Sequence, residues 1–222
     1  ERLLAEKTER KYALLVSNAT VALEILYTSF RLRMGKKPTV LMPVNTFWST
    51  ATAALRAGCD VQWCPIKPNL HADLPVDLDG VDLFVYVPIG GWVDLPTVTA
   101  LEESGVPFIG DSAQALGTPG GALVGEASVV SFYATKVFGV GEGGAILTDD
   151  PEVYELCKSL RDNGRDSQKN CRLATWEGRG GRVNELTAVA IWTILEYAWA
   201  GTIMHQGGKL DLYREALEQE GC

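Results

Sequence analysis

Residues 129–148 read VVSFYATKVFGVGEGGAILT, and this stretch indicates the architecture of the chain. Two apolar runs, Val129–Tyr133 and Ala145–Thr148, enclose a glycine-rich segment that carries one lysine, Lys136. Continuous apolar runs of this length are typical of strands buried on both faces, as in parallel sheets. The stretch therefore predicts two core strands whose connecting loop holds an amine near the end of a sheet.

The same kind of run recurs along the chain and alternates with helical patterns. Four further strands are predicted, at Thr39–Met42, Val61–Ile66, Leu83–Val87 and Pro107–Gly110. Helices are predicted at Thr20–Arg33, Phe47–Ala57, Asp94–Ser104, from Asp150-Pro151-Glu152 to Asn163-Gly164, from Val183 towards Tyr197, and at Lys209–Glu220. Strands that alternate with helices imply βαβ units. We therefore expect an α/β fold of three layers, with a mainly parallel sheet flanked by helices.

Composition narrows the class of protein. The 222 residues carry a net charge of −8 and are 46% hydrophobic, which argues against disorder and against a nucleic-acid surface. No apolar run is long enough to span a membrane, and no leader pattern stands at the beginning. The five cysteines show no C-x-x-C spacing and there are two histidines, so we expect no metal site. Reduced thiols favour a cytoplasmic location.

Four polar or aromatic positions fall where predicted strands give way to loops or helices. Ser17-Asn18-Ala19-Thr20 begins a helix, where free N–H groups favour an anion, although a simple helix cap explains it too. Asp111 follows a strand and is placed either to meet a cation or to cap a turn. Lys136 is either an amine nucleophile or a surface lysine, and Phe47 either stacks on a flat ligand or packs in the core.

Taken together, these positions describe a single site with an anion cradle, an aromatic face, a carboxylate and a lysine. Pyridoxal 5'-phosphate requires this set, because a lysine forms the Schiff base and an acid pairs with the pyridine nitrogen. The residues alone therefore favour pyridoxal phosphate as the cofactor.

The chain resembles the DegT/StrS family of pyridoxal-phosphate-dependent sugar aminotransferases, which have the aspartate aminotransferase fold type I. The resemblance is carried by Asn18-Ala19-Thr20-x-Ala22-Leu23, Pro43-x-x-Thr46-Phe47, Asp111-x-Ala113-Gln114-Ala115-x-Gly117, Ser131-Phe132-Tyr133-x-Thr135-Lys136, Gly141-Glu142-Gly143-Gly144-Ala145, Arg161-x-x-Gly164 and Arg182-Val183-Asn184-Glu185-Leu186-x-Ala188. It implies an aminotransferase that moves an amino group, from glutamate or glutamine, to a keto group of a nucleotide-linked sugar or cyclitol.

The resemblance also implies a role for each candidate residue. Lys136 forms the Schiff base and carries the proton, and Asp111 holds the pyridine nitrogen protonated. The remaining cofactor contacts are Phe47 on the ring, Gln114 beside the phenolic oxygen, and Ser131 with the backbone of Ala19 and Thr20 at the phosphate.

The family resemblance further implies that residues 1–222 form the large cofactor-binding domain, with residues from about 183 to 222 helical. The small C-terminal domain of the family is expected to be absent or truncated, and a homodimer is expected because the family places its cofactor near a subunit interface. Two alternatives stay open at this point. One is a sugar dehydratase of the same family, which would have histidine in place of Lys136. The other is a non-catalytic cofactor-binding or partner subunit.

Overall fold

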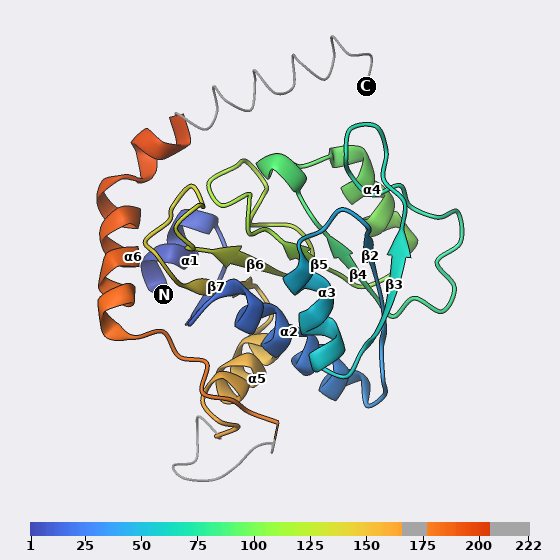
Figure 1. The fold of residues 1–222 in the computed structure, drawn as a ribbon, viewed down its shortest axis with the longest axis horizontal. Coiled ribbons are helices and arrows are strands. Elements are labelled where there is room, and N and C mark those ends of the chain that lie inside the picture. The colour runs from blue at the N-terminus through green and yellow to red at the C-terminus, as the bar shows by residue number, and fades with distance from the viewer. Residues whose placement is uncertain (166–176, 205–222) are drawn as a thin grey trace.

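A seven-stranded sheet lies between two layers of helices in the computed structural model, which describes residues 1–165 and 177–204 (Figure 1). The strands are β1 (Tyr12–Val16), β2 (Thr39–Pro43), β3 (Asp60–Cys64), β4 (Leu83–Tyr86), β5 (Phe108–Asp111), β6 (Ala127–Ser131) and β7 (Gly144–Thr148). Their order across the sheet is β1-β7-β6-β5-β4-β2-β3. All six predicted strands are confirmed, whereas β1 was not predicted.

The sheet is mainly parallel, as predicted. Strands β3, β2, β4, β5 and β6 pair in parallel, and β7 is antiparallel to both β6 and β1. The run Ala145–Thr148 is therefore a buried strand, but it does not run parallel to its neighbours. The connection between β6 and β7 folds back on itself as a hairpin, in which the N–H of Val140 donates to the carbonyl of Phe132 and the N–H of Ala134 donates to that of Gly141, so β7 returns antiparallel to β6.

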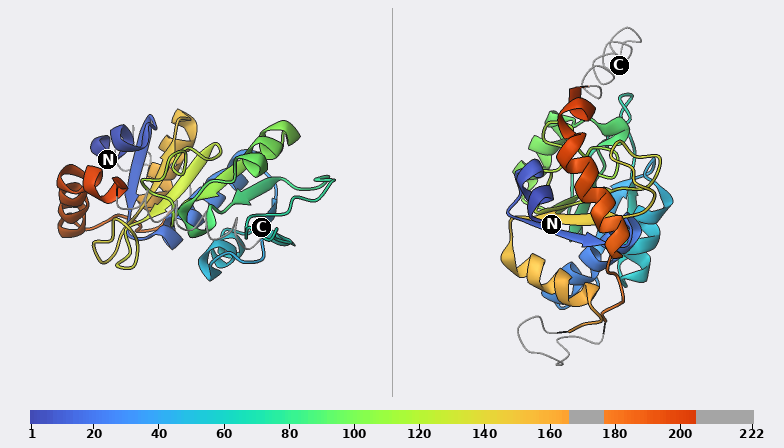
Figure 2. Two further views of the ribbon diagram at one scale, coloured as in Figure 1. Left: turned by 90° about the horizontal axis from the view of Figure 1, so that it is seen from above. Right: turned by 90° about the vertical axis from the view of Figure 1, so that its left-hand side faces the viewer.

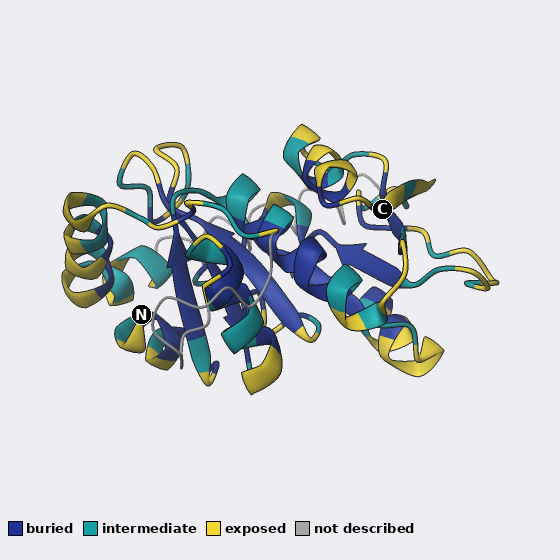
Figure 3. Cartoon of the chain, turned by 90° about the horizontal axis from the view of Figure 1, so that it is seen from below, coloured by how far each residue is buried: buried dark blue, intermediate teal, exposed yellow. Residues whose placement is uncertain are grey.

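The helices are α1 (Arg2–Thr8), α2 (Ala19–Met34), α3 (Trp48–Arg56), α4 (Leu95–Ser104), α5 (Pro151–Arg161) and α6 (Glu185–Tyr197), with a short 3-10 turn at Ile89–Gly91. Helices α2, α3 and α5 pack together on one face of the sheet, and α1 lies beside α6 at the other face (Figure 2). The strands between the layers are buried except for the edge strand β3, which is largely exposed, and the outer sides of the helices are exposed (Figure 3). The predicted three-layer arrangement is thus present.

Alternating side chains of one strand explain how the sheet serves two cores. In β1, Leu14 and Val16 join the cluster under α2 and α5, whereas Ala13 and Leu15 join the cluster under α1 and α6. Successive strand residues point to opposite faces, so a strand that is apolar at every position is stable only between two helical layers. A third cluster, which includes Leu101 of α4, covers the β2–β4–β5 end.

Local signals set most helix ends. Asp150 caps α5 by accepting hydrogen bonds from the N–H groups of Glu152 and Val153, with Pro151 at the first position, as the sequence indicates. Asp94 precedes α4 but makes no such cap, because its carboxylate binds the side chains of Lys67, Asn69 and Thr97 instead. The helix predicted at Lys209–Glu220 lies outside the described residues. Of the interval 183–222 that is predicted to be helical, the structure describes residues 183–204, which include α6.

The candidate site residues lie at one edge of the sheet, which is the edge formed by the carboxyl ends of the parallel strands. The carboxyl ends of β2, β4, β5 and β6 meet there, and β1 ends there too. Because β7 runs the other way, its amino end at Gly144 reaches the same edge. The loops that follow or precede these strands therefore surround one space.

Candidate active site

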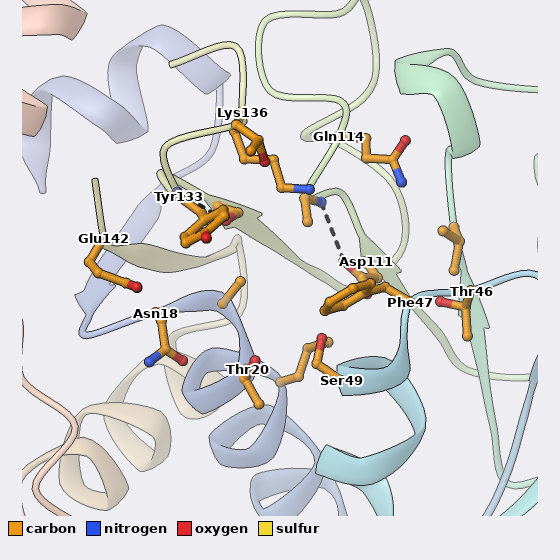
Figure 4. A pocket seen from close by; sticks show the side chains of 16 residues that line it. Asn18, Thr20, Thr46, Phe47, Ser49, Asp111, Gln114, Tyr133, Lys136 and Glu142 are labelled. Atoms are coloured by element: carbon orange, nitrogen blue, oxygen red, sulfur yellow. Dashed lines mark hydrogen bonds between the residues drawn. The ribbon is translucent and has the colours of Figure 1, made fainter. Parts of the chain in front are cut away.

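A cavity of about 410 Å³ opens at this edge of the sheet. All seven residues predicted to bind the cofactor line it, and Figure 4 shows side chains from several elements directed into it. The lining residues are Asn18, Ala19, Thr20, Leu23, Thr46, Phe47, Ser49, Val87, Asp111, Ala113, Gln114, Ser131, Tyr133, Thr135, Lys136 and Glu142. The predicted residues thus lie around one cavity, while their roles in binding a cofactor stay predictions.

The amino end of α2 forms one wall of the cavity. Asn18 caps the helix, since its Oδ1 accepts a hydrogen bond of 2.9 Å from the N–H of Val21. The N–H groups of Ala19 and Thr20 belong to the first helical turn, where no intrahelical acceptor exists. The helix cap is therefore confirmed at Asn18, and anion binding by the N–H groups of Ala19 and Thr20 stays a prediction with which this cap is compatible.

The position of this helix end depends on Gly144. A Cβ added to Gly144 would lie 2.5 Å from the nitrogen of Ala19 and 2.5 Å from the carbonyl carbon of Asn18. Asn18 also forms an isolated bridge with Gly143. The helix end is therefore seated directly on the start of β7, at a separation that only glycine permits.

Ser131, the last residue of β6, adds a hydroxyl to the same wall. Its Oγ accepts a hydrogen bond of 3.3 Å from the N–H of Tyr133, so its own hydrogen remains available to a ligand. The hydroxyl of Ser131 and the N–H groups of Ala19 and Thr20 are thus three hydrogen-bond donors on the same wall of the cavity. We refer to Ala19, Thr20 and Ser131 as the anion seat.

Asp111 lies at the end of β5 and is buried, with 6% of its surface exposed. Its Oδ2 accepts a hydrogen bond of 2.6 Å from the hydroxyl of Thr50, and its Oδ1 accepts one of 3.3 Å from the N–H of Ala113. Burial raises the pKa of Asp111 above its usual value, and the Thr50 hydroxyl, the Ala113 N–H and the Lys136 charge all act against that rise. A cationic ring nitrogen would be a further partner for this carboxylate.

Lys136 extends from the loop after β6 into the cavity (Figure 4). Asp111 lines the same cavity, so the amine and the carboxylate lie at the same end of the sheet, and the Lys136 charge acts to lower the pKa of Asp111. Phe47 stands at the amino end of α3 with 67% of its surface exposed, so it does not pack in the core as the alternative reading holds. Tyr133 lines the cavity as well and is 48% exposed.

Gln114 is held by the loop after β4. The N–H of Gly90 donates a hydrogen bond of 3.0 Å to Oε1 of Gln114. Because a backbone N–H can only donate, the oxygen of the amide is committed to Gly90 and the NH₂ group remains to donate to a ligand. Gly91 has a φ of +90°, and a Cβ there would lie 2.7 Å from the carbonyl oxygen of Gln114, so this loop also fits closely.

Several residues of the site were not predicted as binding residues. Ser49 and Thr50 lie on α3, and Glu142 lies on the loop before β7. Thr46 lies in the turn before α3, and its hydroxyl is 2.7 Å from the hydroxyl of Thr50 on the helix. The sequence shows two threonines near the start of a helix, but it does not indicate which side of α3 faces Asp111.

Other kinds of site are not seen in the described part of the chain. Residues 1–165 and 177–204 contain no group of three or more His, Cys, Asp or Glu side chains that could hold a metal ion. None of the helices in these ranges has the length and apolarity needed to cross a membrane.

The sequence and the fold are similar to those of known aminotransferases. The model of the DegT/DnrJ/EryC1/StrS aminotransferase family matches residues 1–221. The UDP-4-amino-4,6-dideoxy-N-acetyl-beta-L-altrosamine transaminase of Campylobacter jejuni is 32% identical over 177 residues, which are 74% of this chain and 46% of that protein. The chain thus spans about half the length of the curated relatives it matches.

Solved structures share the fold. Helicobacter pylori PseC, an aminotransferase involved in the biosynthesis of pseudoaminic acid, matches with a TM-score of 0.79 and 27% identity, over 89% of this chain and 56% of that one. Bacillus subtilis NtdA, solved with bound cofactor PMP, matches with a TM-score of 0.79 and 23% identity, over 90% of this chain and 47% of that one.

Proposed function

Because this chain belongs to the DegT/DnrJ/EryC1/StrS aminotransferase family, we propose that it forms the cofactor-binding part of a pyridoxal-phosphate-dependent aminotransferase. The observation that carries the proposal is that Lys136 and Asp111 line one cavity together with the free amino end of α2. An amine, a carboxylate and an anion seat in one space are the three polar requirements of this cofactor.

The residues present fit the cofactor. Ala19, Thr20 and Ser131 supply hydrogen-bond donors for a phosphate, and the donors need no basic side chain because the helix dipole favours an anion there. Asp111 offers a buried carboxylate to the ring nitrogen. The exposed ring of Phe47 offers a face for stacking. A cavity of about 410 Å³ has the size of a typical small-molecule site.

When bound, the cofactor supplies an aldehyde that condenses with an amine and a ring that accepts electrons from the substrate carbon. Lys136 would supply the amine that holds the cofactor and would carry the proton at the substrate carbon. Asp111 would keep the ring nitrogen protonated, because its negative charge favours a cation beside it. The NH₂ group of Gln114 would be the donor towards the phenolic oxygen, since the amide oxygen accepts from Gly90.

The substrates we propose are a small amino donor, glutamate or glutamine, and a keto group on a nucleotide-linked sugar or a cyclitol. The relatives from Campylobacter jejuni and Helicobacter pylori named as UDP-sugar transaminases support a sugar acceptor. They favour transamination over the dehydratase alternative, and so does the lysine at position 136. The non-catalytic alternative is decided by turnover of the whole protein.

We extend the proposal to a homodimer in the cytoplasm. Aromatic side chains at the cavity and beside it, Phe47 and Trp48, are 67% and 81% exposed, and covering such groups stabilises an interface. Cys59, Cys64 and Cys157 are free buried thiols, which suits a reducing compartment. Sedimentation equilibrium tests the dimer. A molecular mass of one chain at protein concentrations above those used for activity measurements would contradict it.

The decisive experiment is a covalent one. After incubation with pyridoxal phosphate and borohydride, a peptide containing Lys136 should carry the reduced cofactor and the Lys136→Ala protein should carry none. Lys158, a surface lysine on α5, provides the matched control, so Lys158→Ala should label like the wild type. Labelling that persists in Lys136→Ala would show that another amine holds the cofactor. Transfer from glutamate to UDP-keto-sugars then tests the substrate class.

A further inference from the structure

Two threonines stand behind Asp111 and form a chain of hydroxyls that leads from the cavity to the carboxylate. The hydroxyl of Thr50 lies 2.6 Å from Oδ2 of Asp111, and the hydroxyl of Thr46 lies 2.7 Å from that of Thr50. Thr50 is completely buried, while Thr46 lines the cavity. These hydrogen bonds thus link Thr46, which a ligand in the cavity can contact, to the hydroxyl of Thr50, which a ligand cannot reach.

The direction of these hydrogen bonds follows from the chemistry of the groups. An ionised carboxylate only accepts, so Thr50 must donate its hydrogen to Asp111. The oxygen of Thr50 is then an acceptor, and Thr46 must donate to it. Thr46 consequently presents lone pairs, and no hydrogen, to the cavity as long as Asp111 is charged.

The surrounding structure fixes Thr50 in place. The hydroxyl of Tyr27, on α2, donates to the carbonyl of Thr50 across 3.1 Å, and the N–H of Thr50 donates to the carbonyl of Phe47 across 3.0 Å. Tyr27 is itself fully buried. The backbone of Thr50 is therefore held by α2 and by the first turn of α3, and its side chain is fully buried beside Asp111.

We propose that Thr50 is a positioning residue for Asp111: oriented by Thr46, its hydroxyl holds one carboxylate oxygen and keeps the group ionised inside the sheet edge. The other oxygen, Oδ1, accepts only the longer bond from Ala113 and keeps capacity for a cationic ring nitrogen, a step that rests on the proposed function. Thr50 does not touch the cofactor in this scheme. It acts through Asp111 alone.

The electrostatics of the site agree with this assignment. Among the groups that hold down the pKa of Asp111 against the effect of burial, the hydroxyl of Thr50 comes first, before the Ala113 N–H and the charge of Lys136. Tyr27 is the other titratable group that interacts with the carboxylate, and burial together with the Asp111 charge raises its pKa well above the usual value, so it stays neutral. Loss of the Thr50 hydroxyl should leave Asp111 protonated over a wider pH range.

The test is a carboxyl ¹³C NMR titration of Asp111 in the full chain without cofactor, with the signal assigned from Asp111→Asn. Thr50→Val should move the titration to higher pH, and Thr50→Ser should return it to the wild-type position because the hydroxyl is restored. Thr28→Val is the matched control, since Thr28 is equally buried on α2 but donates to the carbonyl of Glu24. Circular dichroism confirms that each variant is folded.

A second measurement follows the ligand. Because a protonated Asp111 no longer attracts a cationic ring nitrogen, Thr50→Val should weaken pyridoxal phosphate binding about tenfold. An unchanged Asp111 titration in Thr50→Val, or a failure of Thr50→Ser to restore it, would overturn the proposal. The cofactor-free titration does not depend on catalysis, so a protein without turnover would contradict the proposed function and leave this result standing.

Discussion

Substitution of Gly144 by alanine should damage the anion seat while leaving the rest of the site intact. Gly144 is the first residue of β7, and a Cβ built on it would point at the nitrogen of Ala19. Its φ lies outside the positive range, so the alanine backbone itself is not strained. The effect comes from the added methyl group, which would meet the first turn of α2.

The size of the effect can be worked out from the contact. The new Cβ would lie 2.5 Å from the Ala19 nitrogen, whereas ordinary contact begins at 3.4 Å, so the helix end must move by 0.9 Å (3.4 − 2.5). Overpacking of this kind costs about 1–3 kcal/mol of stability. A shift of that size takes an N–H out of hydrogen-bonding range of a phosphate oxygen, which costs about 1.5–3 kcal/mol, or about ten- to a hundredfold in affinity.

The assay compares two ligands that differ only in the phosphate. Absorbance titrations with pyridoxal phosphate and with pyridoxal should show that Gly144→Ala loses its preference for the phosphorylated ligand by about tenfold or more. Its affinity for pyridoxal should stay close to that of the wild type. Gly201→Ala is the control, because a Cβ there meets nothing within 4 Å. Equal losses for both ligands, or no loss, would show that the end of α2 does not bind the phosphate.

Two further predictions concern pH and stability. Burial lowers the pKa of His71 to about 4 while the unfolded value is about 6.5, so only the unfolded chain gains a proton between these values, and stability should fall by up to about 3 kcal/mol as the pH drops from 6.5 to 4. The unfolding free energy from urea titrations should fall in this way between pH 7 and pH 4.5 in the wild type and not in His71→Phe. An equal fall in both proteins would contradict the buried neutral ring. Burial acts to raise the pKa of Asp149, but the Lys11 N–H and the Arg10 guanidinium outweigh it and hold that pKa below its usual value. Asp149→Asn should therefore lower the unfolding free energy at pH 7, and its difference from the wild type should shrink below about pH 4; a constant difference would refute the ion pair as its cause.

Much of the fold could be predicted because its signals are local. Apolar runs such as Leu83–Val87 and cap patterns such as Asp150-Pro151 need no knowledge of distant contacts. The strand β1 could not be predicted with the same ease. This strand has five residues, and it forms by pairing with β7, which lies more than a hundred residues further along the chain. The antiparallel direction of β7 depends instead on how the loop after β6 folds back, which the apolar run Ala145–Thr148 does not indicate.

The site divides in a similar way. Lys136, Asp111 and the start of α2 were recognisable because strand ends and helix starts are themselves sequence signals. Thr50 was not, because its importance comes from packing: a threonine within a helix of small residues shows no preferred face until α2 covers one side of it. Asp94 shows the opposite case. Its position suggests a cap, yet the nearby cation of Lys67 competes for the carboxylate.

The reversed direction of β7 has a mechanical consequence. The amine of Lys136 and the glycine that seats α2 lie on one short hairpin between β6 and β7, closed by backbone hydrogen bonds from Ala134 to Gly141 and from Val140 to Phe132. A displacement of this hairpin would move the amine of Lys136 and Gly144 together, which would preserve the spacing between the amine and the amino end of α2. The position of one side of the cavity therefore depends on a single segment of the chain.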